Sequence, residues 1–142
     1  MTLYADSAYP IKKELEAIHS VQFEQLCSPG TWGTASQRIA IVNEARQGGY
    51  KAGVLEKPAN PGAQTEVNLS EVERRVVNQL SISPKDIDQA FYEQALKDGL
   101  TDAEYVEILG LISRFACFDI FARGIGVPLR PLPIPQPGDP SR

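Results

Sequence analysis

TDAEYVEILGLISRFACFDIFARG, residues 101–124, is the stretch of this sequence that decides the fold. Thr101 and Glu104 have the spacing of a capping box, in which each side chain accepts a hydrogen bond from the other residue's backbone N–H group. Apolar residues then recur three or four positions apart as far as Ile120, which is the period of an α-helix. At 1.5 Å per residue, such a helix spans about 33 Å, so we expect it to be the central helix.

Four further helices are predicted upstream of this stretch. Thr34 and Ser70 each precede a Gln or Glu at capping-box spacing, and Ser83-Pro84 is typical of a helix start with Pro in the first turn. No segment alternates between apolar and polar residues with period two, so no strand is required. The expected fold is therefore all-α, a compact bundle of about five helices covering residues 11–26, 34–49, 70–80, 83–99 and 101–124.

The segment after the last helix contains six prolines within residues 128–142. Proline cannot continue a helix, because it lacks a backbone N–H group and its ring clashes with the preceding turn. We therefore divide the chain into a helical domain, residues 1–127, and a proline-rich tail, residues 128–142. The tail is expected to run extended over the surface or onto a neighbouring subunit.

Composition excludes several classes of function. The 142 residues carry a net charge of −4 and include one His and two Cys, too few for a closed zinc site of four Cys and His ligands in one subunit or for a disulfide scaffold. The chain has no basic cluster, secretory signal or long apolar run, so nucleic acid and membranes are not expected partners and a cytoplasmic location is expected. No phosphate-cradling glycine motif is present, and no cofactor or metal is predicted.

Three side chains are candidates for catalysis. Cys117 lies one helical turn after Arg114, which would favour its thiolate in a shared polar pocket, but its aromatic neighbours favour a buried, inert thiol. Glu107 is a solvated residue or a single interior acid, and His19 is a packing group or an acid-base catalyst. Cys27, at the end of the first helix, is expected to be a packing residue or a surface thiol.

Four other residues are candidates for a ligand site or a subunit interface. Arg114 and Asp119 interrupt an apolar helix, and their burial would require partners from another helix or subunit. Trp32 and Tyr50 are large aromatics, which contact a core or an interface more often than a ligand. A helix that is apolar on all sides must be covered, so a homo-oligomer is expected.

Two blocks of the sequence resemble the alkylhydroperoxidase D-like proteins, relatives of carboxymuconolactone decarboxylase. The first runs from Tyr9 through Ser28-Pro29-Gly30-Thr31-Trp32 to Arg46, and the second from Leu100 to Pro133. The resemblance implies an all-helical oligomer. In redox-active members it also implies a thiol peroxidase or disulfide reductase that uses a C-x-x-C pair, often a nearby His, and a proton-relaying Glu.

The redox residues of that family are missing here. Residues 47–57 contain neither Cys nor His, and Gln37 occupies the position expected for the proton-relaying Glu. We therefore expect a redox-inactive scaffold that binds a small molecule or a protein partner. The alternatives are a thiol-dependent peroxidase that uses Cys117 with an external thiol, and a lyase-like enzyme that uses Glu107 or His19.

Overall fold

The computed structural model describes residues 2–142 and confirms the all-α prediction. Within these residues the regular structure is helical, apart from one isolated β-bridge. No helix in the described part of the chain is long and apolar enough to cross a membrane. The helices are α1 at Lys13–Leu26, α2 at Ala35–Lys51, α3 at Glu71–Ile82, α4 at Gln89–Lys97 and α5 at Asp102–Gly124, with a 3₁₀ turn, η1, at Pro84–Asp86.

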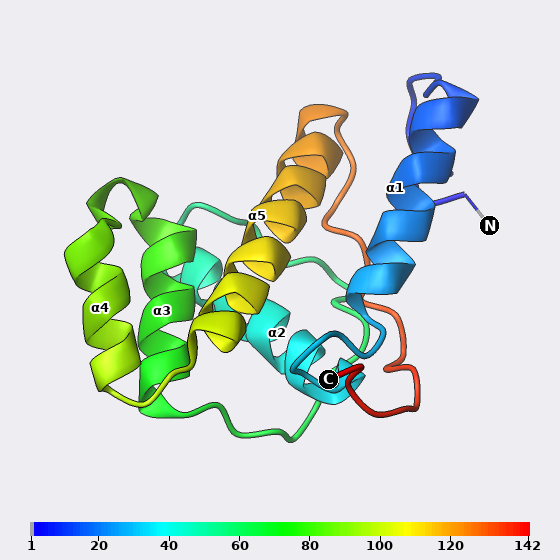
Figure 1. The fold of residues 1–142 in the computed structure, drawn as a ribbon. Coiled ribbons are helices and arrows are strands. Elements are labelled where there is room, and N and C mark those ends of the chain that lie inside the picture. Colours follow the sequence, from blue (N-terminus) through cyan, green and yellow to red (C-terminus); the bar gives the residue numbers. More distant parts are fainter. Residues whose placement is uncertain (1) are drawn as a thin grey trace.

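Helix α5 is central, as its length predicts. It packs against α2, α3, α4 and α1, and α2 also packs against α3. In Figure 1, α5 crosses in front of α2, with α1 on one side and the α3 and α4 pair on the other. No other helix lies in front of α5 in this view, so one side of the central helix faces away from the bundle.

The three predicted capping boxes are all formed. Thr34, Ser70 and Thr101 each accept a hydrogen bond from the backbone N–H three residues later, and the side chain at that later position bonds back. These reciprocal bonds satisfy backbone donors that would otherwise lack partners in the first helical turn. The sequence therefore located the starts of α2, α3 and α5.

The predicted start of the fourth helix is wrong. Ser83 and Pro84 open the 3₁₀ turn η1, and α4 begins only at Gln89, where the Asp88 side chain accepts a hydrogen bond from Phe91 N at 2.9 Å. Ser83 Oγ instead donates to an Asp86 carboxylate oxygen at 2.6 Å. The Ser83 hydroxyl, which was expected to cap the fourth helix, is therefore engaged in a different hydrogen bond. Smaller differences are that α1 starts at Lys13 and that α2 continues through Gly48 and Gly49 to Lys51.

The proline-rich tail lies against its own chain. Leu129, Arg130 and Leu132 are buried, and Leu132 exchanges backbone hydrogen bonds with the segment around Gly62. Gly62 has a φ of +82°, and a Cβ there would lie 2.1 Å from the backbone nitrogen of Leu132. Only glycine therefore allows this close approach of two backbones.

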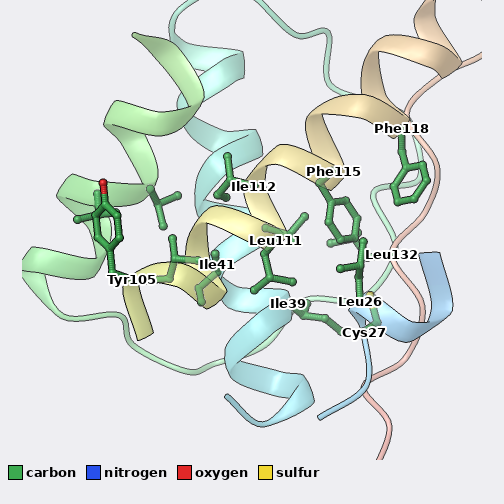
Figure 2. Packing of buried hydrophobic residues seen from close by; sticks show 14 of the residues in the cluster. Leu26, Cys27, Ile39, Ile41, Tyr105, Leu111, Ile112, Phe115, Phe118 and Leu132 are labelled. Carbon is green, nitrogen blue, oxygen red and sulfur yellow. The ribbon is translucent and has the colours of Figure 1, made fainter. Parts of the chain in front are cut away.

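The hydrophobic core lies between α5 and the helices around it. Phe115, Leu111 and Ile112 of α5 meet Ile39 and Ile41 of α2, as Figure 2 shows. Leu132 from the tail and Leu26 and Cys27 from the end of α1 complete the same cluster. The core thus joins the tail and the end of α1 to the central helices.

Candidate functional site

A cavity of about 370 Å³ lies between α2, α3 and α5. We call it the Arg46 cavity. Its polar side chains are Arg46, Ser81 and Asp119, and the hydroxyl of Ser81 donates to the Val77 carbonyl within its own helix. The other lining residues are apolar or glycine, including Val42, Leu55, Leu80, Ile112, Phe115 and Ile120. Its size and apolar walls are those of a small-molecule pocket.

A buried ion pair forms the polar part of the Arg46 cavity. Arg46 Nη2 donates to Asp119 Oδ1 at 2.8 Å and Arg46 Nε donates to Asp119 Oδ2 at 3.3 Å. The guanidinium also donates from Nη1 to the Arg130 carbonyl at 3.0 Å. These three bonds use three of the five N–H groups of the guanidinium.

Burial and the ion pair act in opposite directions on Asp119. Removal of the carboxyl from water raises its pKa above the usual range, while the adjacent guanidinium favours the charged form. Tyr50, one turn after Arg46, is half-buried, and burial raises the pKa of its hydroxyl as well. The charges of Arg46 and Asp119 also act on the pKa of Tyr50, but Tyr50 does not line the cavity.

Sequence reasoning singled out Asp119 but missed Arg46. The need for a partner from another helix was foreseen for Asp119, and α2 supplies that partner 73 positions away. The available signal was the position of Arg46 itself. It follows Ile39 and Val42 and precedes Gly49 at helical spacing, so a charged residue lies on the buried face of α2.

Neither cysteine lines the Arg46 cavity, and both are free thiols. Cys27, considered a possible surface thiol, is 1% exposed, and burial raises its pKa to about 12. Cys117, expected to be buried and inert, is exposed on α5. The expectation was wrong because the apolar and polar residues of α5 are not segregated to opposite sides of the helix, so aromatic neighbours in the sequence do not show which side faces the core.

Glu107 is a structural anchor, neither a solvated residue nor an isolated acid. Its carboxylate accepts hydrogen bonds from the backbone nitrogens of Thr31 at 2.7 Å, Trp32 at 3.2 Å and Gly33 at 2.7 Å. Arg38 Nη1 lies 3.4 Å from the same carboxylate. With these partners, Glu107 holds the loop before α2 against α5.

His19 packs between α1 and α5, away from the Arg46 cavity. Its Nδ1 lies 2.8 Å from the hydroxyl oxygen of Tyr4, and its ring contacts the rings of Phe118 and Phe121 edge-on. Burial lowers the pKa of His19 and raises that of Tyr4 to about 12. His19 is thus buried among aromatic rings and does not line the Arg46 cavity.

Arg114 and Trp32 also lie outside the Arg46 cavity. Arg114 is exposed on α5 and does not pair with Asp119, which pairs with Arg46. Trp32 lies in the loop before α2, with the Arg142 guanidinium 3.3 Å from its ring centre. Its indole nitrogen has no hydrogen-bond partner among residues 2–142. Of the seven predicted site residues, Asp119 alone lines the Arg46 cavity.

Comparisons of the chain with protein-family models, with curated proteins and with solved structures gave no match. The described residues also hold no cluster of three His, Cys, Asp or Glu side chains that could bind a metal ion. The function is therefore inferred from the geometry of the Arg46 cavity.

Proposed function

We propose that this protein is a redox-inactive binding protein with an alkylhydroperoxidase D-like helical scaffold. Its ligand is a small, uncharged, mainly apolar molecule that carries a hydrogen-bond acceptor such as a carbonyl group. The observation that carries the proposal is the Arg46 cavity, an apolar space of about 370 Å³ with a paired guanidinium in its wall.

The chemistry of the walls supports this class of ligand. The apolar lining favours a ligand with little polar surface, since such surface would lose its contacts with water. The charges of Arg46 and Asp119 cancel, so the ion pair attracts neither an anion nor a cation strongly. The remaining N–H groups of Arg46 can donate to one acceptor on the ligand.

The burial of Cys27 supports a role without the two-thiol redox chemistry of that family. A peroxidase mechanism of the family type needs one thiolate to attack and a second thiol close by to resolve the sulfenic acid. Cys27 is buried with its pKa raised to about 12, so its thiol is protonated at neutral pH. Cys117 does not line the cavity.

Titration with prodan tests the proposal. This uncharged naphthalene ketone changes its emission when it leaves water, and it combines an apolar body with one carbonyl. We expect saturable binding to the wild type and at least about tenfold weaker binding to Ala45→Phe, whose ring would fill part of the cavity. Ala90→Phe, on the exposed side of α4, is the matched control and should bind as the wild type does.

Equal binding by wild type and Ala45→Phe would refute the proposed ligand site. The peroxidase alternative has a separate test, because it requires hydroperoxide consumption with a dithiol reductant. We expect no such consumption above background. Turnover that is present in the wild type and lost in Cys117→Ser would show that the protein is an enzyme.

A further inference from the structure

An open cleft of about 500 Å³ lies beside Trp32, at the start of α5. We call it the Trp32 cleft. Its walls come from the loop before α2, from α4 and from α5, and its lining residues are Thr31, Trp32, Tyr92, Asp102, Ala103, Val106 and Glu107. None of these residues lines the Arg46 cavity, so the two sites are separate.

Two aromatic side chains give the Trp32 cleft surfaces that attract cations. The faces of aromatic rings carry negative partial charge, and Trp binds cations more strongly than Tyr or Phe does. Tyr92 makes an edge-on contact with Tyr105, whose ring centre lies 5.0 Å from its own, and this contact helps to fix its position. Trp32 and Tyr92 are both half-buried, so part of each side chain is accessible.

The charges around Trp32 are mainly negative. Trp32 and Glu107 line a second, smaller hollow of about 50 Å³ as well as the cleft. The charged side chains that line these two spaces are all acidic: Glu73, Asp102, Glu104 and Glu107. Arg38 pairs with Glu107, and within residues 2–142 the other three acids have no ion-pair partner. The cleft therefore favours a cationic ligand over an anionic one.

Asp102 supplies a carboxylate that a cationic ligand can reach. Its Oδ1 accepts a hydrogen bond from Ala103 N at 2.7 Å, whereas its Oδ2 has no hydrogen-bond partner in the described part of the chain. Asp102 is exposed, so a ligand can bind it without unpacking α5. A guanidinium suits the site, because its N–H groups donate to a carboxylate and its plane stacks on an aromatic ring.

Trp32 already contacts one guanidinium within the chain. The guanidinium carbon of Arg142 lies 3.3 Å from the centre of the Trp32 ring. Backbone hydrogen bonds hold the tail there, from Ser141 N to the Gly30 carbonyl at 2.9 Å and from Arg142 N to the Thr31 carbonyl at 3.3 Å. Arg142 does not line the cleft, which stays open beside this contact. The chain itself thus provides one example of a guanidinium on this ring.

We propose that the Trp32 cleft binds an arginine side chain of a peptide or protein partner, with its guanidinium held by Trp32, Tyr92 and Asp102. The acidic walls repel the carboxylate of the free amino acid, so the ligand is an arginine whose carboxyl group is in a peptide bond. This site does not depend on the ligand proposed for the Arg46 cavity.

Fluorescence titration tests the Trp32 cleft, because the chain contains a single Trp. The probe is N-acetyl-L-argininamide at constant ionic strength, and the control ligand is N-acetyl-L-citrullinamide, whose uncharged urea group has nearly the shape of a guanidinium. We expect saturable binding of the arginine probe and at least about tenfold weaker binding of the citrulline compound. Free L-arginine should also bind more weakly than the amide. Calorimetry of the same titrations measures binding without relying on emission.

A charge-removing variant tests the role of Asp102. Asp102→Asn keeps the shape of the side chain and should weaken binding of the arginine probe by about three- to tenfold. Asp86→Asn removes the same charge from η1, which precedes α4 whereas Asp102 follows it, and should bind as the wild type does. Equal binding of the arginine and citrulline compounds, no saturable binding of the arginine probe, tighter binding of free arginine, or equal effects of the two substitutions would each overturn the proposal.

Discussion

The carboxylate of Glu107 fixes the position of the loop before α2 through its hydrogen bonds. Three backbone N–H groups and the half-buried guanidinium of Arg38 surround it, so each of its oxygens has a partner. Gly30 lies against the same pair, because a Cβ there would be 2.2 Å from a Glu107 oxygen. Such bonds to a charged acceptor stabilise a loop, and removal of the acceptor would leave several donors unsatisfied.

His19 should make the stability of the protein depend on pH. Burial lowers its pKa in the folded state, so the unfolded chain binds the proton more readily. The free energy of unfolding should therefore fall as the pH drops below about 6.5, the usual pKa of histidine, and stop falling below the folded-state pKa. The limiting slope is about 1.4 kcal/mol per pH unit.

Denaturant unfolding at a series of pH values measures this effect. His19→Gln keeps a polar side chain beside Tyr4 but does not titrate, so its stability should depend less on pH in this window. The difference between the wild-type and His19→Gln curves gives the contribution of His19 separately from that of carboxylates such as Asp119. Because the pKa of Asp119 is raised in the folded state, this carboxyl makes the free energy of unfolding rise as the pH drops. Parallel curves for the two proteins would contradict the prediction.

Among the elements, the helices differ in how clearly the sequence marks them. Capping boxes identified the starts of α2, α3 and α5, because a Ser or Thr three positions before Glu or Gln is a local pattern with a local cause. The start of α4 was predicted five residues too early, at Ser83 and not at Asp88, because of contacts within this short segment. Both Ser83 and Asp88 are good capping residues, and the choice between them depends on the contact of Ser83 with Asp86.

The candidate site was harder to predict than the helices. The pairing of Arg46 with Asp119 joins positions 73 apart, and the sequence alone does not say which charged residues will meet. The exposure of Cys117 was also not predicted, because apolar residues occur on every side of α5 and their periodicity therefore does not identify its buried face. Its covered and uncovered sides become distinct only once α2 and α3 are in place.

The start of α4 gives a prediction for this element. Asp88→Ala removes the acceptor for the backbone N–H of Phe91 and should lower the free energy of unfolding by about 1 kcal/mol. Ser83→Ala should cost less, since the Ser83 hydroxyl contacts an exposed carboxylate and caps no helix. Denaturant unfolding of both variants measures the difference. A larger loss for Ser83→Ala would mean that α4 begins at Ser83 in solution.

In the whole molecule, the tail joins parts of the chain that the helices alone do not connect. Arg130 donates to both carboxylate oxygens of Asp6, at 2.6 and 3.0 Å, and to the Leu3 carbonyl at 3.1 Å. Its own carbonyl accepts from Arg46 of the cavity wall. The first part of the tail is therefore packed against the rest of the chain and hydrogen-bonded to it.

Two apolar residues of the tail can be used to measure how much its packing stabilises the fold. Leu132 is 3% exposed and packs in the main core, whereas Ile134, two positions later, is 79% exposed. Leu132→Ala should lower the free energy of unfolding by about 2–5 kcal/mol, because it removes buried apolar surface and leaves a cavity. Ile134→Ala deletes comparable surface from solvent and should change it by less than about 0.5 kcal/mol. Denaturant unfolding compares the two variants. Equal, small effects of the two substitutions would mean that Leu132 does not pack on the core in solution.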